Sequence, residues 1–336
     1  MISTSSHCLQ QKQAIPKVIM ADISSRMTAM KALLPTLENA LKSFTSSDCR
    51  FKVIRTVVPS SNQSSSNSNS TLQPPFSPRT LLILDSSYNP PSRAHLALAS
   101  SAVASLSSSS SRLLLLFSTH NADKAPSPAS FTHRLAMMIL FAEDLQAHLY
   151  QRNSTYAQVA VDIGLTTAPY YADKSAAIAT EEPVAYPSKP THIHLLGYDT
   201  LIRLLAPKYY SKFDPPLSAL SPFFGVGHRL LVLLRPDSSS DNAVTGDSEE
   251  EQRGYVSKLC HGSLEKDGFQ REWADQIGVL EGDDTRAAVG ISSTEIRKAA
   301  KQREWSEVER MCTPGVAAWL KEMDLYKDDS NVANMP

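Results

Sequence analysis

Short apolar runs alternate with helix-like patterns along most of the chain. The runs are rich in leucine, isoleucine and valine, which is typical of strands buried on both faces of a sheet. Strands are therefore expected at Phe51–Val58, Leu81–Leu84, Arg112–Phe117, Tyr156–Ile163, Thr191–Leu196, Leu230–Leu234 and Gly278–Glu281. Apolar residues three or four apart predict helices at Met27–Phe44, Phe131–Tyr150, Thr200–Leu205, Val256–Ile277, Ser292–Lys301, Trp305–Met311 and Val316–Met323. The alternation predicts an α/β fold with a doubly wound parallel sheet, helices on both faces and a small helical part at the C-terminus.

Polar, low-complexity stretches suggest how the chain is divided. Serine, asparagine and proline cannot bury a core, and an acidic, serine-rich run is typical of a surface insertion. We expect a disordered N-terminus (1–26), a helix and an edge strand (27–58), a flexible linker (59–79), one main domain (80–328) with a disordered insertion (237–252), and a tail (329–336).

Composition and charge narrow the class of protein. The formal net charge of -1 gives no general reason to expect nucleic acid as a partner, and no apolar run is long enough to span a membrane. The four cysteines have no metal-ligand spacing, so neither a protein metal site nor a disulfide framework is indicated. A reducing compartment, cytoplasm or nucleus, fits best. Lys12, Lys17 and Arg26 make a mitochondrial presequence the weaker alternative.

The segment Leu81–Ser107 reads as a buried strand, a polar turn and a helix. Pro90 and Pro91 prevent helix before Ser92, which is a good N-cap residue. The free N–H groups and the positive end of the helix dipole then favour an anion at the edge of the sheet. His95 lies in the first helical turn and could donate to that anion, although a single histidine at such a position is more often structural.

A second constellation lies at Gly290–Arg297. Ser292 and Glu295 have the spacing of a capping box, which starts a helix and again leaves N–H groups pointing outward. Helical side chains lean toward the N-terminus, so Arg297 can reach back over the same place. Taken alone, the pattern more often means a capped helix with a solvated arginine.

Together the two segments resemble the signatures of the nucleotidyltransferase superfamily, whose fold is Rossmann-like. Ser86–His95 is similar to Gly-x-Phe-Asn/Asp-Pro-x-His/Thr-x-Gly-His, and Ile291–Arg297 matches Ile-Ser-Ser-Thr-x-Ile-Arg without a mismatch. The resemblance covers roughly Leu81 to Tyr326. Within the superfamily the chain looks most like the nicotinamide mononucleotide adenylyltransferases, in particular a divergent fungal-type branch.

The resemblance implies roles for individual residues. The catalytic residues would be His95 and Arg297. The ATP-binding residues would be Ser86, Ser87, Tyr88, Asn89, Ser92, His95, Ile291, Ser292, Ser293, Thr294 and Arg297. The substrate-binding residues would be Lys124, Arg134, Gly197, Asp199 and Tyr209. Mg²⁺ would accompany ATP, with no metal site built by the protein itself.

The sequence departs from the family pattern at several positions. Ser86 and Ala94 stand where glycine is usual, Ser92 stands at the His/Thr position, and Tyr88 replaces phenylalanine. The tryptophan that stacks on the pyridine ring in eukaryotic relatives is missing, and Tyr209 lies in the corresponding region. These changes bear on the substrate and on the efficiency of the reaction more than on its class.

The implied reaction joins ATP and nicotinamide mononucleotide to give NAD and pyrophosphate, in NAD biosynthesis or salvage. Two alternatives stay open. The first is a transferase that uses CTP or prefers nicotinate mononucleotide, because the signatures bind triphosphates without choosing a base. The second is a nucleotide-binding regulatory protein with weak or lost transfer. The oligomeric state does not follow from the sequence.

Overall fold

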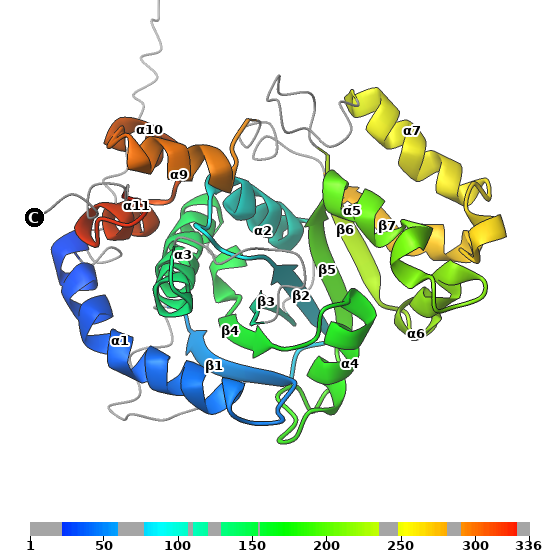
Figure 1. Ribbon diagram of the computed structural model, residues 1–336, viewed down its shortest axis with the longest axis horizontal. Coiled ribbons are helices and arrows are strands. Elements are labelled where there is room, and N and C mark those ends of the chain that lie inside the picture. Colours follow the sequence, from blue (N-terminus) through cyan, green and yellow to red (C-terminus); the bar gives the residue numbers. More distant parts are fainter. Residues whose placement is uncertain are drawn as a thin grey trace, which may run out of the picture.

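The computed structural model (Figure 1) describes residues 22–59, 77–106, 110–119, 129–153, 155–234, 248–280 and 290–327. Most of the expected linker, most of the expected insertion, Lys124 and both chain ends lie outside these residues.

One sheet of seven strands forms the centre of the molecule, in the order β1-β4-β3-β2-β5-β6-β7. The strands are β1 (Phe51–Val57), β2 (Thr80–Asp85), β3 (Ser111–Ser118), β4 (Val161–Thr166), β5 (Thr191–Gly197), β6 (Arg229–Leu233) and β7 (Ile277–Leu280). Neighbouring strands are parallel except β1, which runs antiparallel to β4 at the edge. From β2 the chain first extends the sheet through β3 and β4, then returns to place β5 on the other side of β2. This is the predicted doubly wound sheet, and its winding reverses between β2 and β5.

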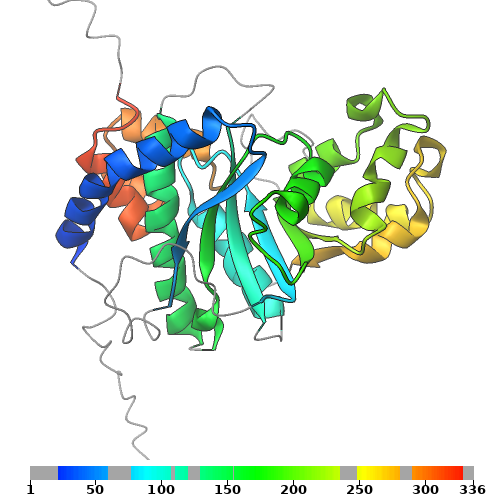
Figure 2. The ribbon, with the colours of Figure 1, turned by 90° about the horizontal axis from the view of Figure 1, so that it is seen from below.

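Helices cover both faces of the sheet. They are α1 (Ile23–Thr45), α2 (Arg93–Ser105), α3 (Phe131–Arg152), α4 (Tyr171–Thr180), α5 (Tyr198–Leu204), α6 (Ser221–Phe224), α7 (Glu249–Cys260), α9 (Ser293–Lys301), α10 (Trp305–Met311) and α11 (Pro314–Glu322). Alternate residues of β2 face opposite ways: Leu82 and Leu84 pack in the core with α2 and α3, whereas Leu81 and Ile83 pack in the core with α4. In both ribbon views α1 groups with α9 to α11 on one side, and α5 to α7 lie on the other (Figures 1 and 2).

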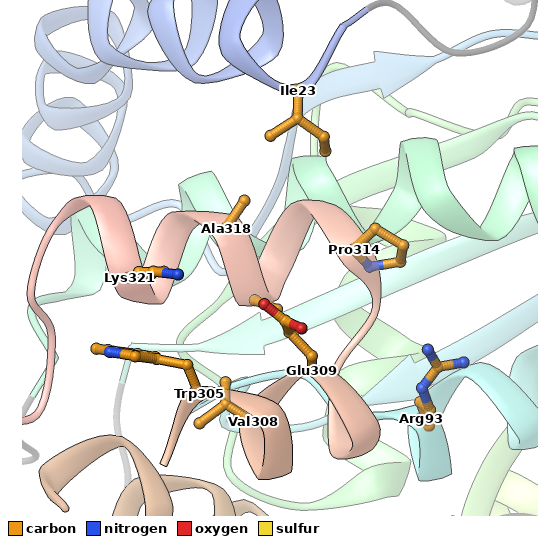
Figure 3. Close-up of a pocket in the computed structure, with 9 residues that line it drawn as sticks. Ile23, Arg93, Trp305, Val308, Glu309, Pro314, Ala318 and Lys321 are labelled. Atoms are coloured by element: carbon orange, nitrogen blue, oxygen red, sulfur yellow. The ribbon is translucent and has the colours of Figure 1, made fainter. Parts of the chain in front are cut away.

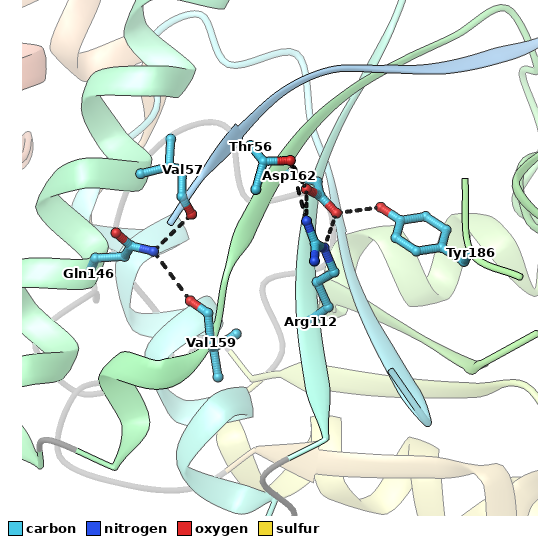
Figure 4. A network of polar contacts seen from close by, with 7 residues as sticks. All are labelled: Thr56, Val57, Arg112, Gln146, Val159, Asp162 and Tyr186. Carbon is cyan, nitrogen blue, oxygen red and sulfur yellow. Dashed lines mark hydrogen bonds and ion pairs between the residues drawn. The ribbon is translucent and has the colours of Figure 1, made fainter. Parts of the chain in front are cut away.

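Two polar clusters attach the N-terminal elements to the sheet domain. Arg26 of α1 forms ion pairs with Glu143 (2.9 Å) and Asp144 (2.8 Å) of α3. At the sheet edge, Arg112 of β3 and Asp162 of β4 form a buried ion pair that also binds β1 through Thr56 (Figure 4). A buried charge or hydroxyl is costly unless it has a hydrogen-bonding or ionic partner. Arg112, Asp162 and Thr56 bind one another, which explains how these polar side chains are tolerated inside the sheet.

Some sequence-based boundaries were wrong. The strand expected at Tyr156–Ile163 is a 3₁₀ turn, Tyr156–Gln158, followed by β4, which begins only at Val161 and continues to Thr166. The helix expected at Val256–Ile277 ends at Cys260, and the chain then continues as short 3₁₀ turns. Gly262 and Gly268, with φ of +81° and +96°, cannot continue a helix.

The helix expected at Val256–Ile277 also begins earlier than predicted, and two short helices, α4 and α6, lie where none was expected. α7 begins at Glu249, inside the segment 237–252 that was expected to be disordered, because Ser248 and Glu251 form a capping box. α4 lies in the connection before β5, which has too weak an apolar pattern to predict a helix. No helix among the described residues is long and apolar enough to cross a bilayer.

Candidate active site at the switch point of the sheet

The candidate site lies where the carboxyl ends of β2 and β5 meet. In open α/β sheets, ligands bind outside the carboxyl ends of the strands, at the point where the winding reverses. Here Ser86 follows β2, and Gly197 ends β5. Because β2 and β5 are paired in parallel, with Leu84 beside Leu195, both of these segments leave the same edge of the sheet.

Tyr88 anchors the turn that follows β2. Its ring is fully buried, and its hydroxyl donates to the carbonyl of Leu84. The residue adopts φ of +45°, which an aromatic residue rarely does and which the buried ring must hold in place. Burial also raises the pKa of the Tyr88 hydroxyl. Its side chain therefore supports the turn from within the core, and only its backbone can contact a ligand.

Ser92 caps α2, as predicted, but its partner was not foreseen. His95, the third residue of the helix, fills the role that Glu or Gln has in an ordinary capping box. The backbone N–H of Ser92 donates to His95 Nδ1 over 3.0 Å, and Ser92 Oγ lies 2.9 Å from the same nitrogen. The other ring nitrogen, Nε2, lies 2.9 Å from Ser86 Oγ. The imidazole is thus bonded at both nitrogens, to the residues on either side of the turn.

The second signature segment docks directly onto the first. Ser292 caps α9, as predicted, by accepting from the backbone N–H of Glu295 (3.2 Å). Ser293 Oγ donates to the carbonyl of Pro90 (2.8 Å). Arg297 Nη1 donates to the carbonyl of Asn89 (2.8 Å). The N-termini of α2 and α9, which lie about 200 residues apart in the sequence, are therefore joined at one turn.

Three further predicted residues surround this junction. Arg297 Nη2 donates to Thr294 Oγ1 (3.1 Å), so the guanidinium is held on its own helix as well as on the turn. Ile291 is buried and belongs to the core, where it anchors the start of α9. Ser87 is half-buried on the turn beside Tyr88.

Arg134 lies deep beside the same junction. It is only 2% exposed, and its Nε donates to the carbonyl of Ala129 (3.0 Å). Its guanidinium packs over the ring of Phe131, 5.2 Å from the centroid. Burial, and also the nearby charge of Arg297, lower the pKa of Arg134. Two arginines therefore lie near each other in this part of the candidate site, a charge distribution that favours an anion.

Two supporting interactions escaped the sequence analysis. Tyr326, after α11, donates from its buried hydroxyl to Asn89 Oδ1 (2.7 Å) and so connects the end of the domain to the turn. Asp85, the last residue of β2, forms a nearly buried ion pair with Lys174 of α4. That pair neutralises a carboxylate that would otherwise repel phosphates next to Ser86. No motif marks either interaction; only the folded chain brings these residues together.

The segment after β5 forms the other side of the site. Gly197 is the N-cap of α5, and a Cβ built on it would meet no atom of the described chain within 4 Å. The space beside Gly197 is therefore open for a ligand. Asp199 lies half-buried in the first turn of α5. Tyr209 is further along, 41% exposed, with Lys208 Nζ 5.2 Å from the centre of its ring.

A separate cavity of about 390 Å³ lies among α1, α10 and α11 (Figure 3). Its walls are largely apolar, with Trp305, Glu309 and Lys321 among them. Of the first signature segment, only Arg93 reaches it. The cavity contains neither ring nitrogen of His95 nor the contacts of Arg297, so the chemistry of the signatures lies elsewhere.

Comparison with known proteins gives a relative of substantial identity. No protein-family model matches the chain. Over 225 residues the chain is 31% identical to a Schizosaccharomyces pombe protein named "Putative nicotinamide mononucleotide adenylyltransferase", a match that covers 66% of this chain and 76% of that protein.

Two solved structures align over most of their length. One is a Plasmodium falciparum nicotinic acid mononucleotide adenylyltransferase complexed with NaAD, at 12% identity and a TM-score of 0.42, covering 74% of this chain and 97% of that one. The other is the same enzyme complexed with APC, at a TM-score of 0.41. TM-scores this low add nothing to the fold described above.

Proposed function

The chain belongs to the nicotinamide mononucleotide adenylyltransferase family, and we propose that it transfers the adenylyl group of ATP to nicotinamide mononucleotide. In this reaction a 5′-phosphate oxygen of the mononucleotide attacks the α-phosphorus of ATP. The bond from the α-phosphorus to the bridging oxygen breaks, and pyrophosphate leaves. The observation that carries the proposal is the docking of α9 on the turn after β2, through Ser293 and Arg297. This contact brings the N-termini of α2 and α9 and the guanidinium of Arg297 together at the turn after β2.

Such a site supplies what phosphoryl transfer requires. The reaction needs two highly charged reactants to be aligned and the charge on the phosphoryl oxygens to be stabilised, more than it needs a general base. We assign the N-terminus of α2, with Ser86 and His95, to the α- and β-phosphates. We assign the N-terminus of α9, with Thr294 and Arg297, to the β- and γ-phosphates. No covalent intermediate on the protein is required.

The acceptor belongs on the β5 side of the site. Gly197 leaves open space there, and Asp199 can orient hydroxyl groups of a nucleotide. Tyr209 offers an exposed ring for stacking on a pyridine. Mg²⁺ would enter bound to the phosphates of ATP. Among the described residues there is no cluster of three or more His, Cys, Asp or Glu side chains that could hold a metal on its own.

The test is a panel of donors and acceptors with the purified full chain. ATP and CTP are each combined with nicotinamide mononucleotide, nicotinate mononucleotide and phosphoethanolamine, and pyrophosphate and the second product are both measured. We expect ATP with nicotinamide mononucleotide to give NAD and pyrophosphate in equal amounts at the highest kcat/KM. A preference for nicotinate mononucleotide or CTP would overturn the assigned substrate. ATP binding without pyrophosphate release from any pair would overturn transfer itself and favour a regulatory role.

A further inference from the structure

The tautomer of His95 follows from the hydrogen bonds around it. A backbone N–H can only donate, and that of Ser92 points at His95 Nδ1 over 3.0 Å. Nδ1 must therefore accept, which places the ring proton on Nε2. Because Nε2 lies 2.9 Å from Ser86 Oγ, the serine oxygen must be the acceptor of that proton. The ring N–H that could donate to a phosphate is thus already directed at Ser86.

The imidazole is also held in this position. Ser92 contacts it through two atoms, and the ring of the buried Tyr88 packs 5.6 Å from it, centroid to centroid. A swing toward a ligand would break the bond to Ser86 and strain those to Ser92. The fold therefore favours a His95 that stays where it is.

Ser86, in contrast, has a proton to offer. Its hydroxyl oxygen accepts from His95 and, over a longer 3.5 Å, from the backbone N–H of Tyr88. Within the described part of the chain, no acceptor is recorded for its own O–H. A hydroxyl that accepts from an imidazole becomes a better donor, since hydrogen bonds in a chain polarise one another. Ser86 is also the first residue beyond β2 and is half-buried at the point where a ligand is expected.

We propose that the Ser86 hydroxyl, and not the imidazole, donates directly to the phosphoryl oxygen of the bound nucleotide, and that His95 positions and polarises that hydroxyl. This inference rests on the proposed function. It gives a role to one of the departures from the family pattern: Ser86 stands where glycine is usual, and its hydroxyl lies 2.9 Å from Nε2 of His95. No covalent bond forms or breaks at Ser86.

The experiment measures kcat and ATP KM for Ser86→Ala, Ser86→Gly and Ser86→Thr, and for Ser86→Ala combined with His95→Ala. Loss of one such donor should lower kcat by about 100-fold in Ser86→Ala. Ser86→Gly should also be slow, and Ser86→Thr, which keeps a hydroxyl, should retain most activity. The double variant should be no slower than His95→Ala alone, because the two groups act as one unit. Ser105→Ala, at the far end of α2, is the control for a serine lost from the same segment.

Several results would overturn the proposal. A Ser86→Ala or Ser86→Gly enzyme as fast as the wild type or faster would show the hydroxyl to be a bystander or an obstruction. Effects that multiply in the double variant would show that the two groups act independently. Melting curves identify any variant that fails to fold, and Ser86→Thr then carries the comparison.

A second measurement separates this proposal from the proposed reaction. Calorimetry with a non-hydrolysable ATP analogue should show affinity about fivefold weaker for Ser86→Ala, the value of one lost hydrogen bond, and unchanged for Ser86→Thr. Nitrogen-15 NMR should show the His95 proton on Nε2 both with and without the analogue. A wild-type chain that binds the analogue but forms no dinucleotide would refute the reaction while leaving this comparison intact. A His95 that changes tautomer, or equal affinity of Ser86→Ala and wild type, would refute the role of Ser86.

Discussion

Replacing Arg297 with alanine removes the cation that joins α9 to the turn after β2. Its guanidinium donates to the Asn89 carbonyl (2.8 Å) and to Thr294 Oγ1 (3.1 Å). A hydrogen bond from a charged donor contributes about 1.5 to 3 kcal/mol, and the half-buried position of Arg297 places it toward the lower value. These bonds are already present in the free chain, where they hold the guanidinium in place. In the bound state the same charge would face the phosphates of ATP, and a charge-assisted contact of similar size would favour the nucleotide complex.

We expect Arg297→Ala to raise the ATP KM by about 10- to 100-fold, which is the affinity equivalent of 1.5 to 3 kcal/mol. Arg297→Lys should lie between the variant and the wild type, because lysine keeps the charge but loses the planar fork. Lys298→Ala is the matched control: it removes an exposed cation from the same helix and should change little.

The assay is steady-state pyrophosphate release at varied ATP, with a melting curve for each variant. Ser293→Ala separates docking from charge, because it removes only the neutral bond to the Pro90 carbonyl. That bond contributes about 1 kcal/mol, so its effect on the ATP KM should stay below about tenfold. An unchanged ATP KM and rate in Arg297→Ala would refute the role given to this arginine.

Other predictions address the neighbouring groups. His95→Ala should lose about two to three orders of magnitude in kcat while keeping its melting temperature within a few degrees, and wild-type turnover would contradict its role. Tyr326→Phe removes the hydrogen bond to Asn89 Oδ1. It should lower the free energy of unfolding, measured by urea titration, by about 1 kcal/mol and raise the ATP KM several-fold. No change in either quantity would show that the bond is dispensable. Burial lowers the pKa of the stacked His192 to about 3 and that of His228 to about 4. Because the unfolded chain then binds more protons below about pH 6.5, stability should fall from pH 7 to pH 5 by on the order of 2 kcal/mol for His192, and equal urea midpoints at the two pH values would contradict this.

The sequence predicted those parts of the fold that depend on local patterns. The buried strands show as apolar runs, and the starts of α2 and α9 follow from Ser92 and Ser292 as caps. Both signatures are contiguous, so the residues alone indicate their chemistry. That the two signature segments lie side by side was inferred only from the family resemblance. In the structure, Ser293 and Arg297 join them by donating to backbone carbonyl groups, and no pattern of side chains in the sequence marks such bonds.

What could not be predicted depends on contacts between distant segments. α4 has little apolar periodicity, so neither the helix nor the ion pair of its Lys174 with Asp85 could be foreseen. Tyr326 marked only the end of the family resemblance in the sequence, whereas in the structure its hydroxyl donates to Asn89 Oδ1. The substitution of Ser86 for glycine suggested reduced efficiency, whereas its contact with His95 indicates a donor in its own right. Sequence reasoning could name the residue but not its partner.

A crystal structure of the full chain with a non-hydrolysable ATP analogue tests most directly whether the two signatures build one nucleotide site. We predict the triphosphate between the N-termini of α2 and α9, with a phosphate oxygen within hydrogen-bond distance of Ser86 Oγ and another within reach of the Arg297 guanidinium. His95 should remain bonded to Ser92 and Ser86. A triphosphate bound away from both helix N-termini, for example in the cavity among α1, α10 and α11, would contradict this assignment.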